Sequence, residues 1–109
     1  MSEDAVTLLY VTCASDAEAD KVAEAVVAAR LAACANIIPG MRSLYWWQGK
    51  LERGSETVLI LKTRASLVEA ATKAVLAAHS YSVPCVIPLP IGAGGNAEYL
   101  NWLLAETNS

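Results

Sequence analysis

The sequence predicts an α+β fold in which two β-α-β units share one sheet and a further helix ends the chain. Strand-like and helix-like patterns follow one another in the order βαββαβ. An internal repeat supports this division, because Thr-Cys-Ala-Ser-x-x-Glu at residues 12–18 recurs as Thr-Arg-Ala-Ser-x-x-Glu at residues 63–69. Prolines fall in the second and fourth strands, which are therefore expected at the edges, with the first and third in the centre. Two such halves form the split βαβ, or ferredoxin-like, sandwich.

The first half begins with a short, apolar, β-prone run at residues 7–12, typical of a strand buried on both faces. Ser15 and Glu18 then form a capping-box pattern, which starts a helix. The apolar positions of this helix recur at helical spacing and are Ala19, Val22, Ala23, Val26 and Ala29. Because many of these side chains are small, we expect the helix to lie close to the sheet.

The middle of the chain predicts a hairpin that is too long for a small domain. Its strands are expected at residues 35–47, interrupted by Pro39-Gly40, and at residues 51–62, with Gln48-Gly49 as the turn. Proline and glycine inside the first of these strands indicate an edge position and a bulge. A fully extended strand of this length, at roughly 3.3 Å per residue, would reach about 43 Å.

The end of this hairpin carries the adjacent aromatic residues Tyr45, Trp46 and Trp47. An exposed apolar strand edge is an aggregation hazard unless another segment pairs with it. The simplest cover is the same hairpin of another subunit. A content of 55% hydrophobic against 17% charged residues also indicates burial against another copy. The alternative is a twisted hairpin that folds over its own helices.

The second half repeats the pattern of the first. A second capping box at residues 66–69 predicts a helix that runs to His79, which is expected to cap the negative end of the helix dipole. A short strand with prolines follows at residues 83–89. A glycine-rich turn then leads to a final helix, for which Asn96 is the expected N-cap.

Composition indicates one domain with an acidic balance. The chain has 109 residues and a formal net charge of -3, so we expect a single domain over residues 1–109 with an ordered core of about 6–106. Nucleic acids and anionic membranes attract basic surfaces, so neither is an expected partner. No apolar run has the length of a membrane span, and residues 1–4 lack the basic start of a secretory signal. A cytoplasmic location is therefore expected.

The three cysteines, Cys13, Cys34 and Cys85, are too widely spaced for a disulfide framework or a local zinc clip. Cys34 lies in an apolar run and is expected to be a small buried residue. The single histidine, His79, makes a weak metal site by itself.

The residues do not predict an enzyme, because the sequence contains no paired nucleophile and base and no phosphate-binding loop. The order βαββαβ also suits an RNA-binding module. That module needs stacking aromatic residues on its central strands, where only Tyr10 is present. An acylphosphatase-like hydrolase has a similar topology, but the chain lacks a convincing arginine-asparagine anion site.

Several motifs in a fixed order carry a resemblance to a known family. They are Leu-Ala-Ala-Cys-Ala-Asn-Ile-Ile-Pro-Gly at residues 31–40, Ser-Leu-Tyr-Trp-Trp-Gln-Gly-Lys at 43–50, Ile-Leu-Lys-Thr at 60–63, His-Ser-Tyr-Ser-Val-Pro at 79–84 and Tyr-Leu-Asn-Trp at 99–102. From about residue 6 to 106 the chain resembles the CutA family of divalent-cation-tolerance proteins. That resemblance implies a PII-like homotrimer in which the long hairpin embraces neighbouring subunits.

The resemblance also implies an association with metal tolerance and copper, and ligand binding in clefts between subunits. The copper-associated cysteine of the family falls near Cys13, and Ser82 and Cys85 stand where the family commonly has acidic residues. A thiol near an imidazole favours a soft metal. We therefore expect weak copper binding that depends on Cys13, His79 or Cys85, and no obligatory cofactor.

The expected ligand cleft lies at a subunit boundary, where apolar walls meet a few polar groups. Lysines at the cleft favour an anionic small molecule, and aromatic rings supply stacking area. The candidate residues are Lys62, Tyr81, His79, Trp47, Lys50, Glu56 and Pro84. Two alternatives stay open. One is an intersubunit ion pair between Lys62 and Glu56 without a ligand, and the other is a structural trimer that serves as a scaffold for a protein partner.

Overall fold

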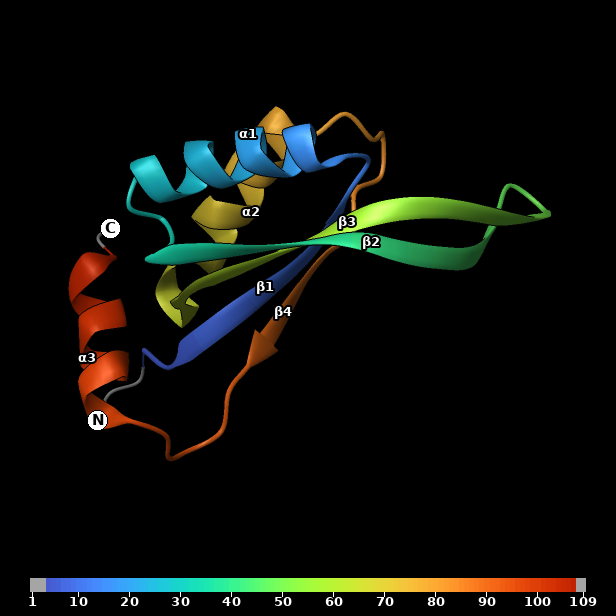
Figure 1. Cartoon of the computed structure of the whole chain (residues 1–109). Coiled ribbons are helices and arrows are strands. Elements are labelled where there is room, and N and C mark those ends of the chain that lie inside the picture. The colour runs from blue at the N-terminus through green and yellow to red at the C-terminus, as the bar shows by residue number, and fades with distance from the viewer. Residues whose placement is uncertain (1–3, 108–109) are drawn as a thin grey trace.

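The computed structural model describes residues 4–107. The predicted domain spans residues 1–109, and its first three and last two residues lie outside the described part of the chain. The predicted absence of a basic start at residues 1–4 therefore also falls mostly outside it. The elements follow in the predicted order (Figure 1): β1 (Val6–Cys13), α1 (Asp16–Ala28), β2 (Cys34–Trp47), β3 (Lys50–Arg64), a 3-10 turn (Ala65–Leu67), α2 (Val68–Ala78), β4 (Val86–Pro90) and α3 (Ala97–Glu106). None of these described helices is long and apolar enough to cross a lipid bilayer.

The strands form one antiparallel sheet in the order β2-β3-β1-β4. This order confirms the predicted ferredoxin-like topology, with β1 and β3 in the centre. β1 pairs with β3 along its whole length, from Val6 opposite Arg64 to Cys13 opposite Thr57. β4 begins later than the sequence predicted, because its pairing with β1 starts only at Val86, opposite Val11.

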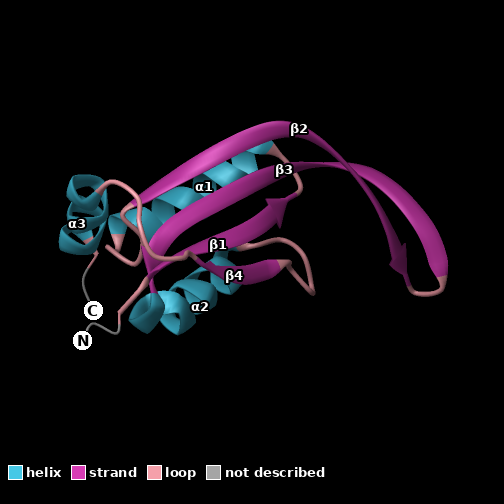
Figure 2. Ribbon diagram, turned by 90° about the horizontal axis from the view of Figure 1, so that it is seen from below, coloured by secondary structure: helices cyan, strands magenta, loops and turns pink. Residues whose placement is uncertain are grey.

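The core lies between the sheet and the pair of helices α1 and α2, which cover one face (Figure 2). Alternate residues of the central strands point into it, and the predicted apolar stripe of α1 packs against them. The buried cluster contains Leu9, Val11, Cys13, Leu59 and Leu61 from the strands and Ala19, Val22, Ala23, Val26, Ala71 and Val75 from the helices. Burying each valine or leucine side chain contributes about 1.5–3 kcal/mol. On the opposite face α3 lies over one end of the sheet, away from the arm (Figures 1 and 2).

β2 and β3 continue beyond the sheet as a two-stranded arm, residues 41–56 (Figure 1). The arm begins at a β-bulge between Ile38 and Met41, where the sequence predicted one. Its tip is a tight turn in which Gln48 and Gly49 both have positive φ, 51° and 83°, as a type I′ hairpin turn requires. The arm leads away from α1 and α2, so the alternative of a hairpin folded over its own helices is wrong. Trp46 on the arm is 73% exposed.

Only the first predicted capping box caps a helix. Ser15 Oγ accepts a hydrogen bond from the Glu18 N–H at 3.1 Å. Ser66 donates instead to the carboxylate of Asp4, from its N–H at 2.8 Å and from its hydroxyl at 2.7 Å. The second capping-box prediction is therefore wrong, because a carboxylate distant in sequence takes both donors of Ser66. Helix α2 starts at Val68 without a side-chain cap.

The segments that precede β1 and follow α3 meet at the end of the sheet opposite the arm. Asn96 caps α3 as predicted, by accepting a hydrogen bond from the Glu98 N–H at 3.0 Å. Arg64, the last residue of β3, donates to Thr107 Oγ1 at 2.9 Å and to the Leu104 carbonyl, and it pairs with Asp4 at 3.0 Å. This arginine therefore holds the segments before β1 and after α3 against the sheet.

The two serines of the repeat should differ in their effect on stability. Ser15→Ala removes a helix N-cap and should lower the free energy of unfolding by about 1 kcal/mol. Ser66→Ala removes one donor from the half-buried carboxylate of Asp4, which keeps the Ser66 N–H and Arg64, and should cost less. Urea unfolding at one fixed protein concentration measures both variants. Equal losses would contradict the different roles assigned to the two residues.

Candidate functional site

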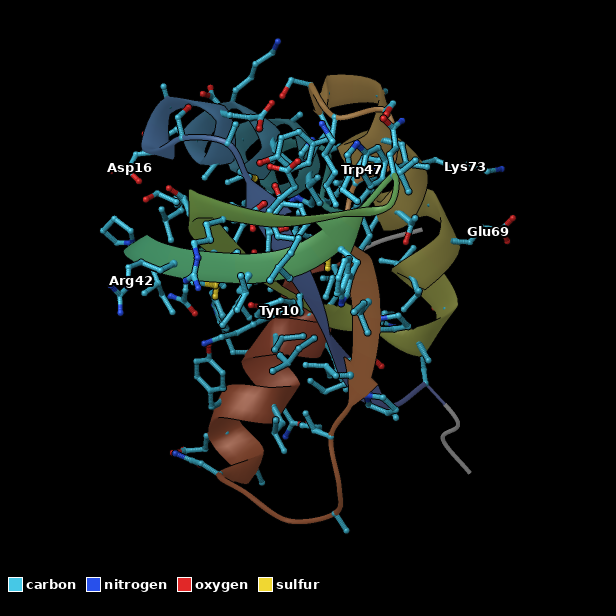
Figure 3. All side chains as sticks on the ribbon, turned by 90° about the vertical axis from the view of Figure 1, so that its right-hand side faces the viewer. Tyr10, Asp16, Arg42, Trp47, Glu69 and Lys73 are labelled. Atoms are coloured by element: carbon cyan, nitrogen blue, oxygen red, sulfur yellow. The ribbon has the colours of Figure 1, made fainter. Side chains whose placement is uncertain are left out.

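A cavity of about 600 Å³ opens on the face of the sheet opposite α1 and α2. It lies between β1, the arm and the loop at residues 81–85 that leads into β4. Figure 3 views the protein from the side of the arm, with Tyr10 on β1 and Trp47 near the end of the arm. The cavity is lined by Tyr10, Thr12, Met41, Ser43, Leu44, Tyr45, Trp47, Glu56, Tyr81, Ser82, Val83 and Cys85.

The β-bulge decides which side chains of the arm face this cavity. Ile38 lies opposite Val58 and Met41 lies opposite Glu56. Between these two pairs β2 advances by three residues while β3 advances by two. Side chains alternate along a strand, and the extra residue shifts that alternation by one. Beyond the bulge the residues that share the face of Glu56 are Met41, Ser43, Tyr45 and Trp47.

Glu56 is the charged centre of the cavity. Its Oε1 accepts a hydrogen bond from the Ser43 hydroxyl at 2.6 Å, and its Oε2 accepts one from the Tyr81 hydroxyl at 3.0 Å. Burial and the hydrogen bond to Glu56 raise the pKa of Tyr81 to about 12. Tyr81 therefore stays protonated at neutral pH and acts as a donor that positions the carboxylate.

A second group of functional side chains lies where β1 meets α1 and the end of α2. One ligand atom each of Cys13, Glu18 and His79 lies within 4.8 Å of the other two. Cys13 is fully buried, and burial, followed by the charges of Glu18 and Glu56, raises the pKa of its thiol to about 11. The thiol is therefore protonated at neutral pH.

The imidazole of His79 is held at both ring nitrogens, and its side chain is fully buried. The Tyr81 N–H donates to Nδ1 at 3.1 Å, so Nε2 carries the proton and donates to the Thr12 carbonyl at 2.7 Å. Glu18 Oε1 lies 3.9 Å from Nδ1. The ring of His79 also packs against that of Tyr81 with their centroids 4.7 Å apart, which links this cluster to the wall of the cavity.

Glu18 connects α1 to the start of the loop that follows α2. Its Oε1 accepts from the Ala14 N–H at 2.8 Å, and its Oε2 accepts from the Ser80 N–H at 2.8 Å. Although burial opposes the shift, the hydrogen bonds from Ser80 and Ala14 hold the pKa of Glu18 below its usual value. The carboxylate is therefore charged at neutral pH beside the thiol and the imidazole.

The structure brings together part of the predicted ligand cleft. Trp47, Glu56 and Tyr81 line one cavity, and His79 packs directly against Tyr81. Pro84 lies in the adjoining loop outside the lining.

The two predicted lysines lie elsewhere. Lys50 is paired with Trp47 in the last rung before the hairpin turn. Lys62 is six residues along β3 from Glu56, which corresponds to about 20 Å of extended strand. Within this chain Lys62 is therefore placed with Cys34 and Tyr99, and its Nζ donates to the Tyr99 hydroxyl at 3.1 Å.

The predicted metal ligands divide between the two faces of the sheet. Cys13 and His79 lie together, whereas Cys85 lines the cavity on the face that carries Tyr10 and Thr12. Cys34 is half-buried, with its Sγ 3.8 Å from the Tyr99 hydroxyl, so the prediction that it is a small buried residue is wrong. Its position at the first residue of an edge strand leaves one side open.

Sequence reasoning missed several residues of these sites. Glu18 was assigned only to the cap of α1, because nothing in the local pattern indicates its contact with Ser80 and His79. Tyr10, Met41, Ser43 and Tyr45 are cavity residues that strand alternation would have grouped once the bulge was counted.

The cluster of Cys13, Glu18 and His79 fits a soft or borderline divalent ion by its donor chemistry. Thiolate, carboxylate and imidazole are all ligands of copper and zinc. Occupancy would require loss of the thiol proton and of the hydrogen bond between Tyr81 and His79 Nδ1, which favours weak binding. Among the described residues no other group of three His, Cys, Asp or Glu ligand atoms comes as close together.

Comparison with known proteins identifies close relatives. Residues 7–106 match the family described as CutA1 divalent ion tolerance protein. Protein CutA 1, chloroplastic, of Oryza sativa subsp. japonica is 47% identical over 100 residues, which cover 92% of this chain and 56% of the rice protein. The chain thus spans just over half the length of that relative. The divalent-cation tolerance protein CutA of Thermus thermophilus is 42% identical over 100 residues, covering 92% of this chain and 96% of the bacterial protein.

Solved structures show the same likeness in three dimensions. The divalent cation tolerance protein (Cut A1) of Thermus thermophilus superposes with a TM-score of 0.90 at 41% identity, over 94% of this chain and 99% of that one. CutA1 from Oryza sativa superposes with a TM-score of 0.91 at 45% identity, over 95% and 94% of the two chains. The predicted resemblance is confirmed, and the chain belongs to the family of CutA1 divalent ion tolerance proteins.

Proposed function

We propose that this protein acts in divalent-cation tolerance as a non-enzymatic homotrimer that binds a soft divalent ion, copper in preference, at Cys13, Glu18 and His79. The observation that carries the proposal is the convergence of three ligand atoms within 4.8 Å from β1, α1 and the end of α2. A thiol and an imidazole match the ligand preferences of copper, whereas magnesium and calcium require oxygen-rich sites. The name of the Thermus relative, divalent-cation tolerance protein, supports the same class of ligand.

A binding role fits these three side chains better than a catalytic one. A thiol, an imidazole and a carboxylate also make up the nucleophile, base and orienting group of some hydrolases. Here the thiol is buried with a raised pKa, and both imidazole nitrogens are hydrogen-bonded to the backbone. An activated thiol nucleophile needs a lowered pKa and access to substrate.

The exposed apolar surface of the arm supports assembly. Large apolar side chains stand in solvent on the arm and on the edge strand β4: Leu44, Tyr45, Trp46, Trp47, Leu51, Ile87 and Leu89. So many large apolar side chains left exposed are typical of a protein interface. In a closed assembly each subunit can cover the exposed apolar side chains of a neighbour. The proposed trimer is a closed assembly with threefold symmetry.

A small anionic ligand held between subunits by Lys62 is the second candidate. The hydrogen bond with Tyr99 raises the pKa of Lys62, so its positive charge is maintained. Among the described residues Lys62 has no ion-pair partner within the chain, which leaves its charge available to a ligand or to Glu56 of another subunit. A scaffold trimer without a ligand is the alternative.

The cytoplasmic location also stays a prediction, since the rice relative is named chloroplastic.

Copper binding should depend on the cluster and not on the other thiols. Cys13→Ala and His79→Ala should each weaken copper binding by at least about tenfold, because each removes one ligand from a small site. Cys34→Ala and Cys85→Ala are matched controls and should bind copper as the unmodified protein does. Isothermal calorimetry with copper, and with a panel of nucleotides and metabolites, measures the effect. Loss of copper binding in Cys85→Ala alone would relocate the metal to the cavity, and no binding of any ligand would favour the scaffold.

Copper affinity should rise with pH. Because the pKa of Cys13 is raised to about 11, the thiol is protonated throughout the neutral range and must release its proton on binding. The apparent affinity should therefore increase by about tenfold per pH unit between roughly pH 7 and 9. Calorimetry across this range, repeated with Cys13→Ala, isolates the contribution of the thiol. A flat profile in the unmodified protein would exclude Cys13 as a ligand.

Assembly should depend on the arm. Leu51 on the arm is 53% exposed, and Leu76 on α2 is 49% exposed, so a change to glutamate places the same charge on two apolar surfaces of similar exposure. Leu51→Glu should dissociate the trimer, because burying a carboxylate without a partner is unfavourable. Leu76→Glu should leave it intact. Sedimentation velocity at micromolar concentration distinguishes the outcomes, and a monomeric unmodified protein would end the trimer proposal.

A further inference from the structure

We propose that occupancy of the metal cluster frees Tyr81 from His79 and, through Tyr81, loosens the base of the arm. The metal cluster is the group of Cys13, Glu18 and His79. The inference rests on the proposed function and adds the regulation of that same site, because metal occupancy and the position of the arm become linked equilibria. Linkage of this kind is reciprocal, so a contact that holds Tyr81 in its present place also opposes metal binding.

The imidazole of His79 offers a metal ion only its Nδ1 atom. Its Nε2 carries the proton and donates to the Thr12 carbonyl at 2.7 Å. The Tyr81 N–H donates to Nδ1 at 3.1 Å. A ring nitrogen has a single lone pair, so a metal ion and the Tyr81 N–H exclude each other at Nδ1. Metal binding therefore takes away the hydrogen bond that holds the backbone of Tyr81.

The ligand atoms of the cluster must also move closer together to hold an ion. They lie within 4.8 Å of one another, and His79 Nδ1 is 3.9 Å from Glu18 Oε1. Bonds of about 2.0–2.3 Å at tetrahedral angles bring ligand atoms to roughly 3.5 Å. Cys13 is paired within a central strand and belongs to the core, so the movement falls on the Glu18 side chain and on His79, which follows the last residue of α2.

Tyr81 carries this movement to the arm. The centres of the Tyr81 and His79 rings are 4.7 Å apart, and the Tyr81 hydroxyl donates to Glu56 Oε2 at 3.0 Å. Glu56 lies opposite Met41 in the first pair beyond the β-bulge, at the base of the arm. When the backbone of Tyr81 loses its bond to His79, the ring that reaches Glu56 loses its support. The bond between Tyr81 and Glu56 therefore weakens as the metal binds.

The base of the arm depends on such side-chain bonds because the sheet no longer supports it there. β1 ends at Cys13, opposite Thr57, and no third strand of the described chain pairs with the arm beyond that point. Two tyrosines connect the base to the rest of the domain: Tyr81 through Glu56, and Tyr10 through Met41 Sδ at 3.4 Å. Weakening the first connection gives the arm more freedom relative to the sheet.

The first test compares the two tyrosines by copper calorimetry. Tyr81→Phe keeps the ring and the backbone N–H and removes the bond to Glu56. Copper binding no longer has to weaken that bond, so the copper affinity should rise by about threefold to tenfold. Tyr10→Phe is the matched control: it removes the other connection to the arm without touching the cluster, and its copper affinity should equal that of the unmodified protein.

The second test measures the loosening directly by hydrogen exchange and mass spectrometry. Saturating copper should speed amide exchange in the peptide that spans residues 79–85 and in residues 41–56 of the arm, although a bound ligand ordinarily stabilises a folded protein. The same addition to Cys13→Ala, which lacks one ligand atom of the cluster, should leave exchange in both segments unchanged.

The outcomes distinguish this inference from the proposed function. If copper binding depends on Cys13 but Tyr81→Phe binds copper equally or more weakly, or exchange in the arm is unchanged or slower, the inference is wrong and the metal site stands. Faster exchange in residues 79–85 alone would confine the change to the loop and overturn the link to the arm. Absence of copper binding by the unmodified protein would end the proposed function and this inference together.

Discussion

The pairing of β1 with β3 is the interaction on which the rest of the molecule depends. It runs the full length of β1 in the centre of the sheet. Because side chains alternate, the same eight residues serve two purposes: Leu9, Val11 and Cys13 enter the core under the helices, while Tyr10 and Thr12 face the cavity. A slip of one residue in this register would move the thiol out of the core and the tyrosine into it. The core and both candidate sites therefore share one constraint.

The two sites differ in the environment that this constraint creates. On the helix side, Cys13 and His79 are withdrawn from water, and the cost of charging a buried group keeps the thiol protonated. On the open side, Glu56 lies in a half-buried position where neutral hydroxyls orient its carboxylate. The first environment suits an ion that binds through a soft donor and displaces a proton. The contact between the tilted rings of His79 and Tyr81 links the two sites.

The bulge at the root of the arm has consequences for both the cavity and the surface. It inverts the alternation of β2, so that Tyr45 and Trp47 turn toward Glu56 and leave Trp46 on the opposite side. Beyond the bulge no third strand of the described chain pairs with the arm, and its apolar side chains gain no cover from α1 or α2. Exposed surface of this kind is unfavourable in water unless a partner removes it. The β-bulge thus places side chains in the cavity wall and leaves others exposed on the arm, where another subunit would cover them.

Local features of the sequence determined the elements and their order. Strand alternation, the Ser15 and Asn96 caps, the Gln48-Gly49 turn and the prolines of β2 and β4 depend on hydrogen bonds and sterics within a few residues, so they could be predicted without a structure. The predicted ligand cleft also included Trp47, Glu56 and Tyr81, and these line one cavity. Only the tertiary structure decided that Asp4 takes the donors of Ser66, that Glu18 joins Cys13 and His79, and that Lys62 lies beside Cys34 and Tyr99. Each of these depends on a contact between residues distant in sequence or on the register of a strand, and no local pattern encodes either.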